Sequence, residues 1–321
     1  MRLVHPQGPE ALACLRAMRT VTAPDGPLPP AVRAMMDAAR RVLMTIDTPV
    51  DIDNLAPIRP AEVAAAVQTP GMAEQLVHAL IVGVLADGEP DPAAFARLQE
   101  IASALGVAPP ALRTIRLLVE QQTVLFRLDF FRRSHIADMF RDTYRNHGGV
   151  LGVAQAVLGQ RGMIEDRELA ARFIALERLP EGSLGHAYFR HCRDLGFAFP
   201  GERGGFPISG AYHDFTHILS GYGTTPEEEL LVGGFTAGYK RANPFYLVLL
   251  TALLWGAGIN VTPLSQPHIT GTLAKGDLAV RFIEAIERGG QVNTDLSDNW
   301  DFWPLLPLPV AEVRARLGMT S

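Results

Sequence analysis

The chain has 321 residues, of which 48% are hydrophobic and 20% are charged. This balance is typical of packed globular proteins, and the length suits about two domains. A formal net charge of -5 excludes a strongly basic surface, so we expect no nucleic acid partner. Two cysteines, Cys14 and Cys192, are too few for a disulfide framework and favour a reducing, cytoplasmic setting. No long apolar run follows Arg2, so we predict no signal peptide.

The N-terminal half predicts helices throughout. Its apolar residues recur at helical spacing, and prolines and glycines separate one segment from the next. We expect helices over residues 1–20, 31–46, 61–69, 71–86 and 91–105 and from residue 109 onward, with a proline-rich loop at 22–30. Strand-like alternation does not stand out in this half. The predicted fold class is therefore all-α.

Residues 80–107 resemble the TerB-like helical domain of tellurite-resistance proteins. They combine an apolar helix, an Ala-Asp-Gly-Glu turn, an acidic helix start and a Leu-Gly break. We place the TerB-like part around 71–122, inside an N-terminal domain of residues 1–147. The resemblance implies that Asp87, Glu89 and Asp91 are candidate metal ligands, whereas their positions favour turn and helix-capping roles.

Gly148-Gly149 marks the predicted boundary to a second domain, residues 148–321. We expect helices over 150–158, 166–179, 186–194, 230–240, 244–256 and 277–287 and a short one from 310, with a glycine-rich loop at 200–210 that is a connector or a mobile lid. Gly233, Gly234 and Gly238 permit the close approach of another helix or of a ligand.

The most apolar segment runs from Phe245 to Ile259. A transmembrane helix needs about 20 apolar residues, and here Gly256 and Gly258 interrupt the run after about fifteen. We therefore predict a buried helix. The alternative is a membrane-facing or lipid-lining role.

The residues that point to chemistry are His213, Asp214, His217 and Glu229. The two histidines are four residues apart and thus lie on one face of a helix, with Asp214 close enough to join them. Imidazoles with carboxylates are typical ligands of divalent metals. We predict a metal site made of these four residues. The alternative is a pair of surface or capping histidines beside an acidic helix start.

The segment between the histidines and Glu229 predicts a tight reversal. Glycines at 221 and 223 mark a turn, and Thr225 is a suitable cap for a helix that begins with Pro226. Glu228 stands three residues after this cap, as in a capping box. We therefore expect two antiparallel helices, with Glu229 reaching back toward the histidines.

The second half resembles the coenzyme Q (ubiquinone) biosynthesis family whose eukaryotic member is numbered four in the pathway. That family carries His-Asp-x-x-His, eleven further residues and a Glu, which residues 213–229 match without a gap. Residues 179–188 match its Leu-Pro-x-Gly-(Ser/Thr)-x-Gly-x-Ala-Tyr segment. Trp300 and the ending Val313-Arg-x-x-Leu-Gly match as well. Residues 209–212 lack the family's Arg-rich approach, and the N-terminal domain is outside its usual architecture.

The resemblance implies a helical bundle that holds a divalent metal, usually zinc, with iron or manganese as alternatives. It also implies a hydrophobic groove for a polyprenyl quinone precursor or another isoprenoid lipid. The implied role is the replacement of the ring carboxylate by hydroxyl through oxidative decarboxylation, or a scaffold for other quinone-biosynthesis proteins. A homodimer with peripheral contact to the inner face of the membrane is implied too.

Two other functions remain open on the residues alone. A metal-dependent phosphohydrolase also uses an adjacent His-Asp pair, and needs an upstream His and a downstream Asp. The candidates for these are His135, His147, His186, His191, Asp277 and Asp295. A zinc protease would need Glu where Asp214 stands. The second alternative is a non-catalytic lipid-binding scaffold, in which the metal only joins two helices.

Overall fold

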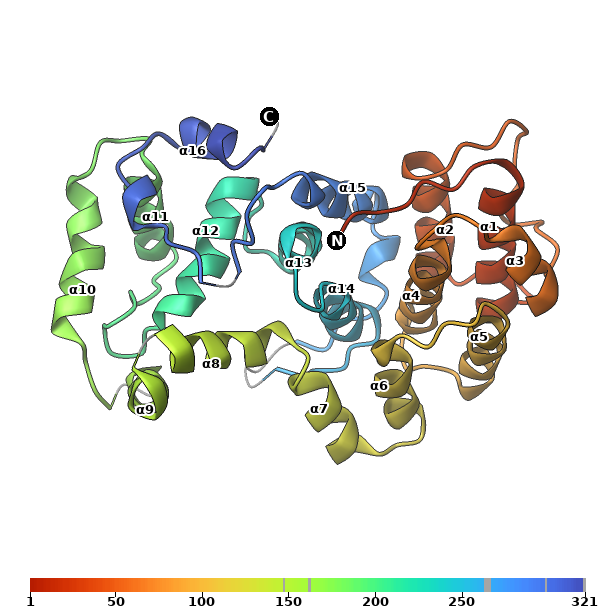
Figure 1. Cartoon of the computed structure of the whole chain (residues 1–321), viewed down its shortest axis with the longest axis horizontal. Helices are drawn as coiled ribbons and strands as arrows, with labels where there is room; N and C mark the ends of the chain where they lie inside the picture. The colour runs from red at the N-terminus through yellow and green to blue at the C-terminus, as the bar shows by residue number, and fades with distance from the viewer. Residues whose placement is uncertain (147, 161–162, 263–266, 298, 320–321) are drawn as a thin grey trace.

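The regular elements of the chain are helices. The computed structural model describes residues 1–146, 148–160, 163–262, 267–297 and 299–319, and within these ranges every regular element is helical (Figure 1). The all-α prediction is therefore confirmed. His147, a predicted partner for a phosphohydrolase site, lies outside the described residues.

Six helices form the N-terminal part, which gathers at one end of the molecule (Figure 1). They are α1 (Gly8–Thr22), α2 (Pro30–Val42), α3 (Pro60–Ala66), α4 (Met72–Leu85), α5 (Pro92–Ala104) and α6 (Pro110–Val119). Proline begins four of them, because its missing N–H is one that no helix start can pair within the helix.

Acidic side chains supply the caps that these prolines cannot. Asp91 accepts hydrogen bonds from the backbone N–H groups of Ala93 and Ala94, both at 3.1 Å, and so caps α5. The Asp87 carboxylate reaches across to α2 and accepts from the N–H groups of Ala31 and Val32, at 3.0 and 3.2 Å. Capping is thus confirmed for Asp87 and Asp91, because carboxylates favour helix N-termini.

Ten helices follow in the rest of the described chain. They are α7 (Thr123–Phe131), α8 (His135–Asn146), α9 (Gly149–Gln160), α10 (Arg167–Ile174), α11 (Leu184–Asp194), α12 (Ala211–Ser220), α13 (Pro226–Tyr239), α14 (Phe245–Thr251), α15 (Leu278–Gly290) and α16 (Val310–Arg316). Helices α13, α14 and α15 lie in the middle, between the N-terminal helices and a group that contains α10, α11 and α12 (Figure 1).

The most apolar segment is a buried helix, as predicted. Helix α14 continues into a five-residue π-helix, Ala252–Gly256, and its side chains from Phe245 to Leu249 are buried. A Cβ added to Gly256 would lie 2.6 Å from the carbonyl oxygen of Leu85, so this segment meets the end of α4 closely. None of the described helices combines the length and the apolarity that a membrane crossing needs.

Glycines on α13 and α15 let these two helices cross with their backbones nearly in contact. A Cβ on Gly234 would come within 2.9 Å of the Phe282 ring. One on Gly238 would overlap the α15 backbone near Gly289, and one on Gly289 would overlap the carbonyl of Phe235. The close approach predicted for the glycines of α13 therefore serves another helix at Gly234 and Gly238.

Buried apolar residues from Ala13 to Leu317 form one continuous core. Helix α2 of the N-terminal part packs on α15, and α4 contacts α14. The division into domains 1–147 and 148–321 stays a prediction, and the two parts share an extensive apolar contact.

We predict that adding one methyl group at the helix crossing destabilises the protein. Gly238→Ala and Gly289→Ala should each lower the free energy of unfolding by about 1–3 kcal/mol, because neither backbone can move aside without disturbing the core. Denaturant unfolding measures this. Gly26→Ala is the matched control: a Cβ there meets nothing within 4 Å, so its effect should stay within about 0.5 kcal/mol. Two alanine variants as stable as Gly26→Ala would contradict the close crossing.

Candidate metal centre

Helices α12 and α13 form the predicted antiparallel pair. Helix α12 ends at Gly221, whose left-handed φ of 82° reverses the chain. Helix α13 begins at Pro226, and the Thr225 hydroxyl accepts a hydrogen bond from the Glu228 N–H at 3.3 Å. These bonds place Glu229 on the first turn of α13, opposite the histidines of α12.

Three of the four predicted ligands converge. The Nε2 atoms of His213 and His217 lie 3.1 Å apart. The two oxygens of Glu229 lie 3.3 Å from His213 Nε2 and 3.4 Å from His217 Nε2. All three residues offer ligand atoms within 4.8 Å of one another. This is the one such group of three or more potential ligands found in the described parts of the chain.

The backbone fixes the tautomer of His217. Its Nδ1 lies 3.2 Å from the carbonyl oxygen of Tyr222, which can only accept a hydrogen bond. Nδ1 therefore carries a proton, and Nε2 faces His213 and Glu229, where it donates a hydrogen bond in the protonated ring and offers a lone pair to a metal in the neutral ring. Metal-binding histidines commonly use this arrangement, because the outer hydrogen bond orients the ring.

Electrostatics favour an ionised Glu229. Burial raises the pKa of Glu229, but the hydrogen bonds and charge attraction of His213 and His217 outweigh it and hold the pKa well below its usual range. Loss of hydration lowers the pKa of the His213 ring, whereas the hydrogen bond to Glu229 and the charge of Glu229 raise it above the ordinary value. The cluster thus holds a carboxylate charge that attracts a cation, either a proton on His213 or a metal ion.

The spacing of the three ligand atoms suits a metal. Ligands bound at 2.0–2.1 Å with tetrahedral angles lie about 3.3 Å from one another, close to the separations seen here. His217 is 3% exposed, whereas the side chain of His213 is 44% exposed. One side of the cluster is therefore accessible, as in catalytic metal sites that keep a position for water or substrate.

Asp214 lies beside this group but is not one of its three members. Burial raises the pKa of its carboxyl, although the nearby His213 and His217 lower it. The buried hydroxyl of Tyr188 and the thiol of Cys192 are its other neighbours. Ligation by Asp214 stays a prediction.

Two further histidines lie near the cluster, and both were among the upstream candidates named for a phosphohydrolase site. The ring of His191, on α11, lies 5.5 Å from that of His217, and burial lowers its pKa to about 4. Burial also lowers the pKa of His135, on α8, to about 3, with contributions from Lys240 and His213. Both are neutral at pH 7. They come from distant segments, so the sequence could name them as candidates, but only the fold shows that they approach the cluster.

The sequence segments that carry the family resemblance meet around α12. Tyr188 stacks on Phe215 at 4.5 Å between ring centroids, and Trp300 meets the same ring edge-on at 5.7 Å. Arg314 donates to the carbonyl oxygens of Leu219 and Ile218, at 2.9 and 3.0 Å, and so pairs the end of α12. These segments thus support the helix that presents both histidines.

The phosphohydrolase alternative gains little from the geometry. That mechanism uses both members of an adjacent His-Asp pair as ligands, and Asp214 is outside the converging group. Asp277 directly precedes α15, and Asp295 accepts a hydrogen bond from the backbone N–H of Arg241 at 2.8 Å. Neither belongs to the cluster, and the same holds for His186.

Comparisons with known proteins leave the family open. No model of a known protein family matches the chain, and no curated protein matches it in sequence. A crystal structure from Nostoc punctiforme PCC 73102, provisionally named a ubiquinone biosynthesis protein, matches with a TM-score of 0.34 and 16% identity. The match covers 79% of this chain and 100% of that one. A score this low establishes neither a shared family nor a shared function.

We predict that the purified protein binds about one equivalent of a divalent metal and that His217→Ala abolishes this binding. The alanine removes the ligand whose tautomer the backbone fixes. Asp214→Asn should weaken affinity by about 10–100-fold if the carboxylate supports the site. Elemental analysis and competition with a chelator give both values. His5→Ala removes an exposed histidine outside the cluster and should retain the metal. Full metal content in His217→Ala would refute the site.

Proposed function

We propose that the protein acts in the metabolism of a prenylated quinone precursor, in ubiquinone biosynthesis, with a divalent metal at His213, His217 and Glu229. Asp214 completes this proposed site as a fourth ligand or as a partner of a metal-bound group. The observation that carries the proposal is the convergence of three ligand atoms from two helices with one side accessible. The motif spacing that gives this convergence is the one that resembles the coenzyme Q family.

An aromatic carboxylate suits such a site. A metal with an accessible position can bind the carboxylate and phenolate oxygens of a hydroxybenzoate ring and stabilise the charge that develops there. The neutral histidines His135 and His191 lie near the cluster and can exchange hydrogen bonds with such a ligand.

Replacement of a ring carboxylate by hydroxyl is an oxidation. Two electrons leave the substrate when water supplies the hydroxyl and the carboxylate departs as carbon dioxide, and oxygen can take up these electrons to become hydrogen peroxide. Zinc does not change its oxidation state, so it could not mediate this electron transfer. Iron or manganese therefore fits the catalytic form of the proposal. Zinc fits a form in which the protein binds and presents the precursor to other quinone-biosynthesis proteins.

We predict turnover of a short-chain prenylated 4-hydroxybenzoate by protein reconstituted with iron(II) or manganese(II) in air. Mass spectrometry would detect the product in which hydroxyl replaces carboxylate. His217→Ala should lose at least about 100-fold in rate, since the metal is lost with it, while His5→Ala should keep its activity.

Binding of the precursor without turnover would instead support the scaffold form. Hydrolysis of a generic phosphodiester that depends on His217 would support the phosphohydrolase. If metal-loaded protein shows neither binding nor turnover of the precursor, the proposed function is overturned.

We further propose that the protein works at a membrane surface, through a face that we call the α7–α9 face. Nine large apolar side chains in and just after these three helices are exposed, and Val124 and Val150 are exposed to 71% and 74%. The nine are Val124, Leu125, Leu128, Phe131, Phe140, Tyr144, Val150, Leu151 and Met163. Exposed apolar surface gathered in this way marks an interaction site.

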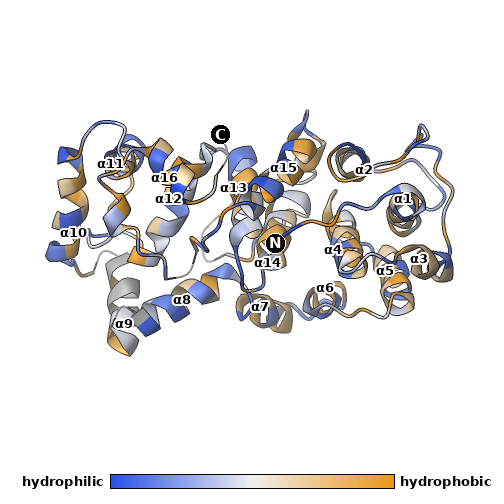
Figure 2. Ribbon diagram, turned by 45° about the horizontal axis from the view of Figure 1, so that its top comes forward, coloured by the Kyte–Doolittle hydropathy of each residue, from blue (hydrophilic) through white to orange (hydrophobic). Residues whose placement is uncertain are grey.

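The charge of this face favours anionic lipid. Figure 2 shows α7, α8 and α9 in a row along one edge of the molecule, with strongly polar and strongly apolar residues on them. Exposed Arg127 and Arg145 stand among the apolar side chains, whereas Arg141 there pairs with Asp138. Apolar residues flanked by arginine are typical of surfaces that rest in the headgroup region of a bilayer.

We predict that the protein sediments with vesicles of phosphatidylglycerol and phosphatidylcholine, and that Leu125→Glu with Leu128→Glu weakens this at least about tenfold. Each leucine contributes about 1.5–3 kcal/mol when it leaves water, and each glutamate adds repulsion from the anionic surface. Ile174→Glu, an exposed apolar position on α10, is the matched control. Vesicle binding by the double variant that equals that of wild type would refute the membrane role. A wild-type dimer that the double variant dissociates would also refute it, because the face would then be an interface between two copies.

A further inference from the structure

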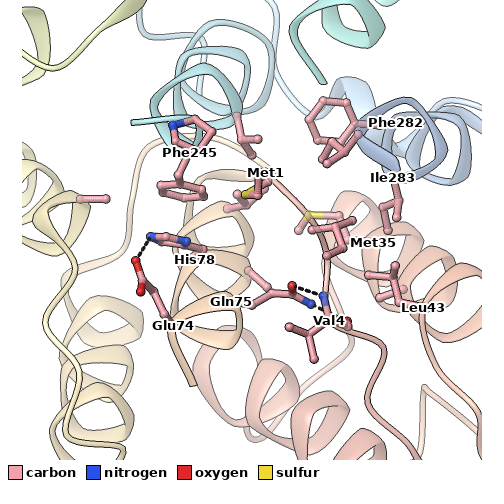
Figure 3. A pocket seen from close by; sticks show the side chains of 18 of the residues that line it. Met1, Val4, Met35, Leu43, Glu74, Gln75, His78, Phe245, Phe282 and Ile283 are labelled. Carbon is pink, nitrogen blue, oxygen red and sulfur yellow. Dashed lines mark hydrogen bonds and ion pairs between the residues drawn. The ribbon is translucent and has the colours of Figure 1, made fainter. Parts of the chain in front are cut away.

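A separate apolar cavity of about 480 Å³ lies between the N-terminal helices and the pair α14 and α15. Met35 and Leu43 come from the α2 side, Ala79 from α4, Phe245 from α14, and Phe282 and Ile283 from α15. Figure 3 shows these walls facing one another across the cavity. His213, His217 and Glu229 do not line it. The volume is typical of sites for small molecules.

His78 is the polar group best placed to meet a ligand. Its ring lies flat against Phe245, with 3.7 Å between centroids and 8° between planes. Its Nε2 lies 3.9 Å from the Glu74 carboxylate, a contact dashed in Figure 3 that is longer than a hydrogen bond. The neighbouring Gln75 already uses its amide, since its oxygen accepts from the Val4 N–H and its nitrogen donates to the Val4 carbonyl (Figure 3).

The ionisable groups at this cavity are neutral, paired or exposed to water. Burial lowers the pKa of His78 to about 4, so its ring is uncharged at pH 7. The amino group of Met1 donates to the carbonyl oxygens of Ala237 and Gly238. Arg2 and Glu74 are exposed at the rim. A charged group carried past this rim to His78 would lose hydration, and the neutral imidazole would not balance its charge.

We propose that this cavity binds an elongated, uncharged lipid, with its hydrocarbon chain among the apolar side chains and a hydroxyl or carbonyl end at His78. The flat His78–Phe245 pair offers one hydrogen-bonding edge beside an otherwise apolar wall. The methionines Met1, Met18 and Met35 give the lining a flexible surface that adapts to a chain. This proposal does not rest on the metal centre.

The two halves of the chain both form the site. Helices α2 and α4 supply one wall, and α14 and α15 supply the other. A ligand that binds only when both walls are in place stabilises the contact between them. Saturating ligand should therefore raise the melting temperature.

The test is fluorescence titration of the full-length protein with Nile red, an uncharged apolar dye, followed by displacement with 1-dodecanol or dodecanoate. We expect saturable dye binding, and displacement by the alcohol at a concentration about tenfold or more below that of the carboxylate. Ala79→Trp should abolish dye binding by filling the cavity. Ala96→Trp, at an exposed position on α5, should leave it unchanged.

Two further variants separate the possible failures. His78→Phe should keep dye binding and the stacking on Phe245. In this variant the alcohol should displace the dye no better than an alkane of equal length, because the hydrogen bond to His78 is lost. His217→Ala should bind the dye like wild type, which distinguishes this site from the metal centre. If Ala79→Trp fails to fold, Ala39→Trp from the opposite wall replaces it. Unsaturable dye binding, equal displacement by alcohol and carboxylate, or wild-type binding in the filled variant would each overturn the proposal.

Discussion

The close crossing of α13 and α15 sets the positions of the other functional elements. Gly234, Gly238 and Gly289 allow this crossing, because a side chain at any of them would meet the opposite helix. The N-terminal end of α13 carries Glu229, and Arg281 of α15 binds the adjacent Glu228 at 2.7 Å. Phe282, which meets Gly234 at this crossing, also forms a wall of the apolar cavity together with Ile283. A shift of α15 would thus change the cavity, and through α13 it would also move Glu229, a proposed metal ligand.

The opposite end of α13 holds α8 by a buried ion pair. Lys240 is 1% exposed and lies 2.7 Å from Asp138 of α8. A buried pair costs desolvation when it forms, but the loss of one partner leaves an isolated charge in the interior, which costs more. The pair therefore favours one position of α8 over others. That position brings His135 toward His213, while Phe140 and Tyr144 of the same helix remain exposed on the α7–α9 face.

Helix starts and tight turns depend on residues that are close in sequence, so the sequence alone could predict them. The helices follow from proline starts and apolar spacing, and the turn between α12 and α13 follows from Gly221 and Thr225. His213, His217 and Glu229 are close in sequence, so a helical period and one turn suffice to bring them together. His191 and His135 approach the cluster from α11 and α8, through packing that no short spacing records. The cavity was missed for the same reason, since its walls are far apart in sequence.

The N-terminal helices therefore form part of the proposed lipid site and are more than a separate N-terminal domain. The apolar segment 245–259, for which a lipid-lining role was the alternative, contributes Phe245, Tyr246 and Val248 to the cavity, but α2 and α4 supply the facing wall. The three converging residues of the candidate metal site lie on α12 and α13. A metal site built from neighbouring helices and a lipid site built from both halves respond to different changes in the molecule.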